Sequence, residues 1–337
     1  MITVKGLSKS FDGIPALDGL DMRIPTGSVY GLVGSNGAGK TTLIKHLAGV
    51  LKQKSGTISF DGNKVWENEG LKQKIGYVPD ELYFPNSYNL KKMRNFYAGI
   101  YDDWNDGRYH EMVDLFQLEE KRRLKTFSKG MKKQAMLCLV LSTMPDYLLL
   151  DEPIDGLDPL VKKLVWRYIA EDVKYRKMTV LVSSHNLKEM EDICDHIGII
   201  SEGRMILERK LDTLKTKIHK IQVSFGSISA IGASIKEAPS GRTVGSDTNV
   251  YEQSRDAGAQ DAGTGADKFD PYKGLNILHK ESRGTVDLMI IDNDIEEARR
   301  ILIQNDPVIM DILPLSLEEI FIYELGGEND EIRELIF

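Results

Sequence analysis

The sequence predicts an α/β protein in which a parallel sheet is covered by helices and a smaller α/β accessory domain follows. The main observation is that apolar strand segments alternate with helical ones, as in "YLLLDEP", "LVKKLVWRYIAEDVKY" and "TVLVSSH". This alternation favours a parallel sheet, because parallel strands need a crossover connection. A second observation is the change of composition after about residue 214, which predicts the end of the first domain.

The first domain, residues 1–214, is expected to combine an antiparallel β part with a helical part. Residues 1–25 alternate loosely and contain turn residues, which predicts two antiparallel strands. The segment "GSVYGLVGSNGAGKTTLIKHLAGVLK" predicts a strand, a Gly-rich loop and a helix, and "GTISFDG" predicts a short strand and turn. Residues 89–124 have a helical, charged pattern, so we expect a helical subdomain at about residues 85–140.

Residues 215–337 are expected to form the accessory domain. Residues 226–270 are rich in Gly, Ala, Ser and Asp, which predicts a flexible insertion. After it, "LNILHKESRGTVDLMIID" predicts a hairpin, "NDIEEARRILIQN" a helix capped by Asn293 or Asp294, and "VIMDILP" a strand. The segment "SLEEIFIYELGG" predicts a capped helix that ends at Gly326.

The composition favours a soluble globular protein. Of 337 residues, 41% are hydrophobic and 28% charged, and the net charge of −7 gives no general support for a wrapped nucleic acid. Cys138 and Cys194 have no metal-ligand spacing, and we interpret both as reduced thiols of a cytosolic protein. No segment reaches the roughly 18 apolar residues of a membrane helix, and "MITVKGLSKSF" lacks the apolar core of a signal peptide. Any membrane role is therefore expected to depend on a partner.

The segment "GSNGAGKT" has the spacing of a phosphate-binding loop, with Gly34, four residues, Gly39, Lys40 and Thr41. Glycines let successive backbone N–H groups curl around phosphate oxygens, and the helix that follows presents its positive end. Lys40 would reach the β- and γ-phosphates, and the Thr41 hydroxyl would bind Mg²⁺. The alternative is an ordinary Gly-rich turn, but the predicted strand before it and helix after it favour the phosphate site. The candidate residues of this loop are Gly34, Ser35, Asn36, Gly37, Ala38, Gly39, Lys40, Thr41 and Thr42.

Acidic residues follow the apolar strand in "YLLLDEP". At the carboxyl edge of a parallel sheet, Asp151 would face the loop and hold Mg²⁺ through water, and Glu152 would polarise the attacking water. Solvated acids at the end of a strand are the alternative. His185 ends "TVLVSSH" at the same predicted edge. A lone histidine there is often structural, but this position favours a contact with the γ-phosphate.

The segment "FSKGMKKQ" has two interpretations. Ser128 can be the N-cap of an ordinary helix with a basic first turn. Alternatively, the segment is half of a nucleotide site that another chain completes. Taken alone, the segment favours the ordinary helix start, because Ser followed by a polar helical run is common.

In this order, the segments resemble the nucleotide-binding subunits of ATP-binding cassette (ABC) transporters, over about residues 1–215. "GSNGAGKTT" resembles the Walker A motif, "FSKGMKKQ" the signature, "LLLDEP" Walker B, "GLD" with Asp158 the D-loop, and "SSH" the switch histidine. The resemblance implies a P-loop NTPase fold. "PLSLEEIFIYELGG" is similar to the tail of bacterial exporter-type members.

The resemblance also implies how the protein works. Family members dimerise head to tail, so Ser128 and Gly130 of one subunit would contact the γ-phosphate of the ATP held by the other, and Asp158 would join the same site. ATP and Mg²⁺ are the expected cofactors. The expected partners are a membrane permease and a second ABC ATPase subunit, identical or different, and no nucleic acid. Such a protein would be cytoplasmic and bound to the inner face of the membrane through the permease.

The signature departs from the family pattern Leu-Ser-Gly-Gly-Gln, because here it is Phe127, Ser128, Lys129, Gly130 and Met131. Ser128 and Gly130 are kept, so phosphate contact remains the prediction. Lys129 either adds a positive charge near the phosphate or is solvated.

Other departures concern the Q-loop and the adenine-stacking ring. Asp80 stands where the family has Gln. An aspartate can still act at the catalytic site and ligate Mg²⁺ through one oxygen. Alternatively, the neighbouring Glu81 takes over the role of the family's Gln. Phe11 stands for the usual Tyr, and stacking needs only a ring face; a core position in the N-terminal sheet is the alternative.

The aromatic segment "ELYFPNSYNL" allows two further interpretations. Tyr83, Phe84 and Tyr88 can form a groove for a short helix of a membrane partner, or pack within the helical subdomain.

Two other functions compete with an ATPase subunit that drives a permease. A soluble cassette ATPase acting on nucleic acid or ribosomes usually has two cassettes or a long coiled-coil insertion, which this sequence lacks. A phosphate-loop kinase would leave "FSKGMKKQ" and "GLD" unexplained.

Overall fold

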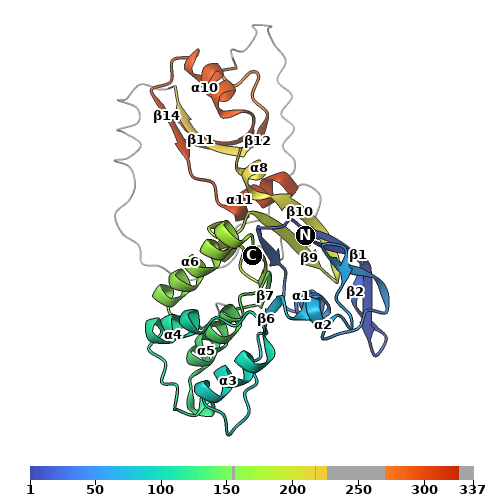
Figure 1. Ribbon diagram of the computed structural model, residues 1–337. Helices are drawn as coiled ribbons and strands as arrows, with labels where there is room; N and C mark the ends of the chain where they lie inside the picture. The colour runs from blue at the N-terminus through green and yellow to red at the C-terminus, as the bar shows by residue number, and fades with distance from the viewer. Residues whose placement is uncertain (154–155, 217, 226–269, 326–337) are drawn as a thin grey trace, which may run out of the picture. The chain divides into compact units, whose positions relative to one another are not determined.

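The computed structural model describes residues 1–153, 156–216, 218–225 and 270–325 (Figure 1). Contacts divide the chain into two compact units: Met1–Leu214 together with Ser316–Phe337, and Lys215–Leu315. The predicted insertion at about 226–270 lies almost entirely outside the described residues, as does the predicted helix end at Gly326.

The first unit contains two sheets. The four-stranded sheet has the order β2-β1-β4-β5, with β1 paired antiparallel to both β2 and β4. The six-stranded sheet has the order β10-β9-β3-β8-β7-β6 and is parallel except for the β9–β10 pair. The strands of the four-stranded sheet are β1 (Ile2–Phe11), β2 (Ile14–Ile24), β4 (Ser55–Phe60) and β5 (Asn63–Lys64). Those of the six-stranded sheet are β3 (Val29–Val33), β6 (Ile75–Val78), β7 (Tyr147–Asp151), β8 (Thr179–Ser184), β9 (His196–Ser201) and β10 (Arg204–Lys210).

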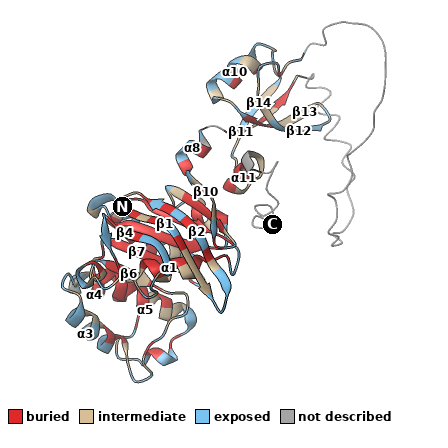
Figure 2. Ribbon diagram, turned by 90° about the vertical axis from the view of Figure 1, so that its right-hand side faces the viewer, coloured by how far each residue is buried: buried red, intermediate tan, exposed pale blue. Residues whose placement is uncertain are grey.

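The central strands of the parallel sheet are fully buried. Every residue of β3, β7 and β8 is buried, and Figure 2 shows β7 in the interior of the first unit. Parallel strands covered on both faces are near-continuous apolar runs, which explains why "VYGLV" and "YLLLD" contain no polar alternation. Their carboxyl ends meet at one edge, where ligands of such sheets bind.

Helices cover the sheets of the first unit and form a helical subdomain. Leu43, Ile44 and Leu47 of α1 share one buried core with residues of both sheets. In the helical subdomain α3, α4 and α5 pack together (Figure 1). Asn side chains cap α3 and α4, which gives these charged segments defined starting points. The helices are α1 (Lys40–Leu47), α2 (Glu69–Lys72), α3 (Leu90–Ile100), α4 (Asp106–Leu115), the 3₁₀ turn η1 (Leu124–Thr126), α5 (Lys129–Ser142), α6 (Pro159–Arg176), α7 (Leu187–Glu191) and α11 (Leu317–Leu325).

The second unit is a small antiparallel sheet with one packed helix. Its strand order is β12-β13-β11-β14, and α10 (Ile295–Ile303) starts at the N-cap Asp294. Ile221, Met289 and Leu302 belong to its buried core. The strands are β11 (Ile218–Ser224), β12 (Ile277–Arg283), β13 (Val286–Asp292) and β14 (Ile309–Leu313), and α8 (Leu211–Lys215) precedes them.

The predicted elements are largely present. The antiparallel N-terminal strands, the C-terminal hairpin and the capped helix α10 are confirmed. Strands β6, β9, β10 and β11 had not been predicted.

The helix α11 belongs to the first unit rather than to the accessory part. Its residues Leu317 and Phe321 are fully buried. Leu317 N donates to Glu191 Oε2 of α7 at 3.4 Å, and Lys188 pairs with Glu318 at 3.5 Å. The chain therefore leaves the first unit after Leu214 and returns to it at Ser316.

Neither cysteine is in a disulfide. Burial raises the pKa of the Cys138 and Cys194 thiols, which keeps both groups protonated and unreactive. Within the described ranges, no helix combines the length and the apolar character needed to cross a bilayer.

Candidate nucleotide site

The Gly-rich loop connects the carboxyl end of β3 to the start of α1. A Cβ atom on Gly34 would lie 2.5 Å from the Ile200 carbonyl oxygen, and one on Gly39 would lie 2.6 Å from that of Ala16. Gly39 also has a φ of 108°, which side chains disfavour. These two positions require glycine, while residues 35–37 are exposed at the tip of the loop.

The side chain of Lys40 lies within this loop and is 5% exposed. Its Nζ donates to the carbonyl oxygens of Gly34 at 2.7 Å and Ser35 at 3.0 Å, and lies 3.6 Å from Glu152 Oε1. A fixed ammonium at the start of a helix adds to the positive end of that helix. The loop therefore offers a concentrated positive site suited to phosphate oxygens.

Asp151, the last residue of β7, is fully buried. Its Oδ1 accepts a hydrogen bond from Ser183 Oγ at 2.8 Å, whereas Oδ2 has no hydrogen-bond partner among the described residues. A buried carboxylate oxygen without a hydrogen-bond partner or cation destabilises the folded protein. A hard divalent cation, bound directly or through water, would satisfy it, because such cations prefer oxygen ligands. Thr41, whose side chain is exposed at the start of α1, would supply the other protein oxygen.

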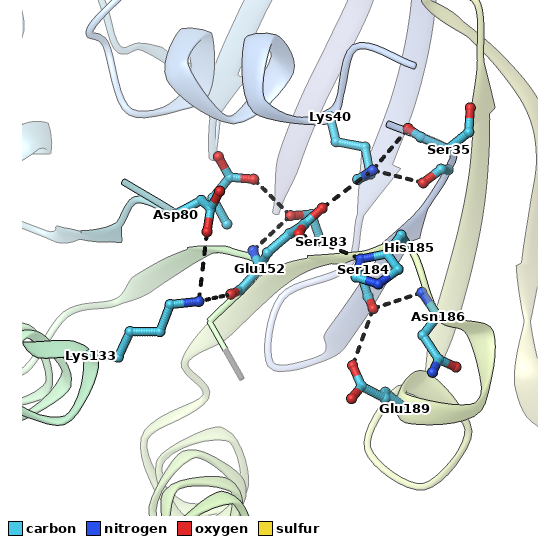
Figure 3. Close-up of polar contacts among 12 residues, drawn as sticks. Ser35, Lys40, Asp80, Lys133, Glu152, Ser183, Ser184, His185, Asn186 and Glu189 are labelled. Carbon is cyan, nitrogen blue, oxygen red and sulfur yellow. Dashed lines mark hydrogen bonds and ion pairs between the residues drawn. The ribbon is translucent and has the colours of Figure 1, made fainter. Parts of the chain in front are cut away.

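Glu152 has a backbone conformation that is uncommon outside glycine, with a positive φ of 47°. Its N–H donates to Ser183 Oγ at 3.1 Å, and its carbonyl oxygen accepts from Lys133 Nζ at 2.6 Å. Its carboxylate lies between Lys40 and His185, whose Nδ1 is 3.5 Å from Glu152 Oε2 (Figure 3). The backbone is thus held on both sides while the carboxylate is directed at the loop.

His185 and Asp80 complete the carboxyl edge of the sheet. His185 follows β8, and its side chain is 49% exposed. Asp80 follows β6, with Oδ1 3.7 Å from Lys133 Nζ. Burial, together with the negative charges of Asp151 and Asp80, raises the pKa of the neighbouring Tyr77. Residues from the ends of β3, β6, β7 and β8 therefore gather at one place, as expected for a parallel sheet.

The signature and D-loop residues make local hydrogen bonds. Ser128 is exposed and caps α5 by accepting from Met131 N at 3.2 Å. Asp158 caps α6 by accepting from Leu160 N at 2.9 Å. A Cβ atom on Gly130 would lie 2.9 Å from the Gly156 carbonyl oxygen, so the signature and the D-loop are adjacent within this chain.

Phe11 is not a core residue. It ends β1, its side chain is 46% exposed, and Lys9 Nζ lies 5.0 Å from its ring centroid. The core interpretation of Phe11 is therefore wrong.

The sequence interpretation missed Lys133 and Ser183. Ser183 receives the Glu152 N–H and donates to Asp151, so one hydroxyl links both acidic residues. The segment "SSH" gives no local sign that this serine contacts the acidic residues. Lys133 lies in "FSKGMKKQ", where adjacent lysines look alike and give no sign of which one is buried.

A phosphate loop on a central parallel strand, with an acidic pair on a nearby strand, defines the class of P-loop NTPases. The family model "ABC transporter" matches residues 17–155. The chain is 29% identical to "ABC transporter ATP-binding protein YtrB" of Bacillus subtilis (strain 168), over 98% of this chain and 99% of that protein. It is 38% identical to "Lantibiotic transport ATP-binding protein SrtF" of Streptococcus pyogenes, over 63% of this chain and 92% of that protein.

A solved structure described as "Structure of ATP binding subunit of ABC transporter" is similar with a TM-score of 0.59 and 27% identity, over 64% of this chain and 92% of that chain. The chain therefore belongs to the ATP-binding proteins of ABC transporters, and it is an ATPase. The predicted family, fold class and activity are confirmed. The nucleic-acid and kinase alternatives gain no support from these similarities.

Proposed function

We propose that this chain is the ATP-hydrolysing subunit of an exporter and that it works as a dimer with ATP and Mg²⁺ held between two chains. The observation that carries the proposal is the cluster of Lys40, Asp151 and Glu152 at the carboxyl edge of the sheet. The similar protein from Streptococcus pyogenes is named for lantibiotic transport. That name favours export, although the cargo is chosen by the permease.

In the proposed reaction, residues 34–42 bind the phosphates of ATP and Lys40 contacts the β- and γ-phosphates. Thr41 and Asp151 would hold Mg²⁺, which supplies charge neutralisation on the phosphate oxygens. Lys40 then exchanges its contact with Glu152 for phosphate oxygens. Glu152, released from that ion pair, polarises the attacking water, and His185 contacts the γ-phosphate.

The exposed start of α5 supports the proposed dimer, because its groups are accessible to a second chain. The Ser128 hydroxyl accepts from Met131 N, and an accepting hydroxyl still has its own O–H to donate. Ser128 can therefore cap its helix and donate to the γ-phosphate held by a partner chain. The Gly130 N–H and the positive end of α5 would complete that contact. Asp158 would join the same site without donating to the phosphate, because a carboxylate only accepts hydrogen bonds. Phe11 would stack on the adenine of the ATP bound by its own chain.

A permease partner would bind where apolar side chains are exposed on the helical subdomain. A cavity of about 380 Å³ is lined by Tyr77, Tyr97 and Met136, among others. On α3 nearby, Phe96 is 54% exposed and Ile100 45% exposed, one helical turn apart. Through that contact the subunit would lie at the inner face of the membrane.

The aromatic segment after Asp80 contributes to this surface only in part. Tyr83 is 83% exposed, whereas Phe84 is buried. Tyr88 is half-buried, with Lys92 Nζ 5.9 Å from its ring centroid. Tyr83 is therefore the most exposed of these three aromatic residues, and Phe84 packs inside the subunit.

Purification from detergent-solubilised membranes tests the proposed function. We expect the chain to co-purify with a polytopic membrane protein in fixed stoichiometry. Stable association with RNA or ribosomes, without such a protein, would instead support the soluble cassette ATPase.

A further inference from the structure

Lys133 is a buried lysine at the centre of the site. It lies on α5, its side chain is 0% exposed, and its ammonium faces the loop that carries Glu152 (Figure 3). A buried ammonium is costly unless it is paired and hydrogen-bonded. Its Nζ donates to the Glu152 carbonyl oxygen at 2.6 Å and lies 3.7 Å from Asp80 Oδ1. The ammonium therefore contacts two residues at the carboxyl edge of the sheet, Glu152 and Asp80.

The bond from Lys133 acts on a strained part of the backbone. A positive φ at a residue with a side chain persists only where its surroundings impose it. Here the Glu152 N–H is held by Ser183 of β8, and its carbonyl oxygen is held by Lys133 of α5. With both peptide groups fixed, the carboxylate is directed at Lys40 and His185.

Asp80 gives Lys133 its countercharge. Its carboxylate is 42% exposed, so it can retain its own hydration while it neutralises the buried ammonium. A neutral glutamine at position 80, the residue expected from the family, would remove this negative charge from the surroundings of the ammonium. The negative charge at position 80 is thus matched by the positive charge at position 133.

We propose that Lys133 is a positioning residue for ATP hydrolysis: it fixes the backbone of Glu152, and Asp80 acts through Lys133 as its countercharge. The inference rests on the proposed role of Glu152 in polarising water. Lys133 lies within the first two turns of α5, whose N-cap is Ser128. The proposed bond therefore connects the helix that begins at Ser128 to Glu152 of the same chain.

The test is a double-mutant cycle on Lys133→Met and Asp80→Asn, with kcat and KM for ATP measured separately. Lys133→Met should lower kcat on the order of 10²-fold, the size expected from misplacing a reacting group. Its KM should change little, because the phosphate loop is untouched. Asp80→Asn should lower kcat by about tenfold. In the double variant, kcat should equal that of Lys133→Met alone, because Asp80 acts through Lys133.

Matched controls separate positioning from stability. Lys163→Met removes the same charge from an exposed position of α6, outside the residues assigned to the site, and should leave kcat and KM unchanged. If Lys133→Met does not fold, Lys133→Gln replaces it in the cycle, because it removes the charge paired with Asp80 and shortens the side chain that donates to Glu152. Unfolding temperature and fluorescent-nucleotide binding are measured for every variant.

The outcomes distinguish this inference from the proposed function. Independent, multiplicative effects on kcat, or an unchanged kcat in the folded Lys133 variant, would overturn the positioning role. Glu152→Gln is measured in parallel. If Glu152→Gln hydrolyses ATP normally, the proposed function of Glu152 fails; if it is inactive while the Lys133 variant is fully active, the role of Lys133 alone fails.

Discussion

The carboxyl edge of the parallel sheet and the amino end of α5 are both assigned to ATP, yet they are built differently. At the sheet edge, Lys40 and Asp151 are buried, and their charged groups are already linked through Glu152 and Ser183. At the start of α5, Ser128 and Lys129 are exposed, and the hydroxyl of Ser128 bonds to its own helix. One half of the site is organised within the chain, and the other is presented outward.

The difference indicates which interactions are available to a single chain. Groups held in place before the ligand arrives lose little freedom when they bind it, and they can stabilise developing charge at low reorganisation cost. Exposed groups at a helix start must be brought to their ligand. The proposed function therefore predicts that one chain binds ATP by itself and that hydrolysis requires a second chain.

The largest effect should come from Glu152→Gln at the organised edge. The amide keeps the shape of the side chain but removes its negative charge, so kcat should fall at least about 10²-fold, as when a catalytic acid–base group is lost. Nucleotide should still bind, and the ATP-bound dimer should accumulate. Phosphate release and light scattering after gel filtration measure the two properties. A normal hydrolysis rate would contradict the role given to Glu152.

Lys40→Ala should reduce the affinity for ATP by about one to two orders of magnitude, since a charge-assisted contact to phosphate contributes roughly 1.5–3 kcal/mol. Titration with a fluorescent nucleotide gives the dissociation constant. Lys45→Ala, on the same helix α1, is the matched control and should bind normally. Equal affinities in both variants would show that the phosphates are not held by this loop.

Ser128→Arg should prevent ATP-dependent dimerisation without changing the affinity of one chain for ATP. Ser128→Asp separates this effect from the helix cap, because aspartate is an equally good N-cap. Its negative charge should nevertheless repel a partner's γ-phosphate and block closure. Gel filtration in the Glu152→Gln background, where the dimer persists, provides the readout. Dimers of normal size in both variants would refute the cross-subunit site.

The smallest effect should come from Ser128→Ala on stability. Loss of the cap should lower the free energy of unfolding by about 1 kcal/mol. Chemical denaturation without nucleotide measures it. Asp294→Ala removes the equivalent cap of α10 in the second unit and should leave ATP hydrolysis unchanged. If the Ser128→Ala variant loses stability but keeps full hydrolysis, Ser128 acts only as a helix cap and has no role at the nucleotide.

The organised edge could be predicted from the sequence because its signals are local. The Gly spacing around Lys40 predicts the loop and the helix that follows it, and the acids after "YLLL" mark the end of a strand. The buried state of Lys133 could not be predicted, since it results from the packing of α5 against distant loops. Strand β9, "HIGIIS", is short and follows acidic residues, so its place beside β3 comes from tertiary pairing rather than from its own pattern.

The assignment of α11 was missed for a similar reason. The capping residues Ser316 and Glu319 bond reciprocally, which predicts where the helix starts but not what it packs against. Its partner α7 lies more than a hundred residues earlier in the chain, and no local pattern reports such a contact.

The return of the chain at α11 matters to anyone who wishes to study the ATPase part alone. Stopping the polypeptide at Leu214 would strip Leu317, Ile320 and Phe321, all at most 1% exposed, from the surface they cover on α7. The truncated protein would expose an apolar patch and would tend to aggregate. A loss of ATPase activity in it would therefore not indicate a regulatory role of the second unit. A variant that lacks residues 215–315 but keeps the segment from Ser316 onward would retain the side chains that provide this cover.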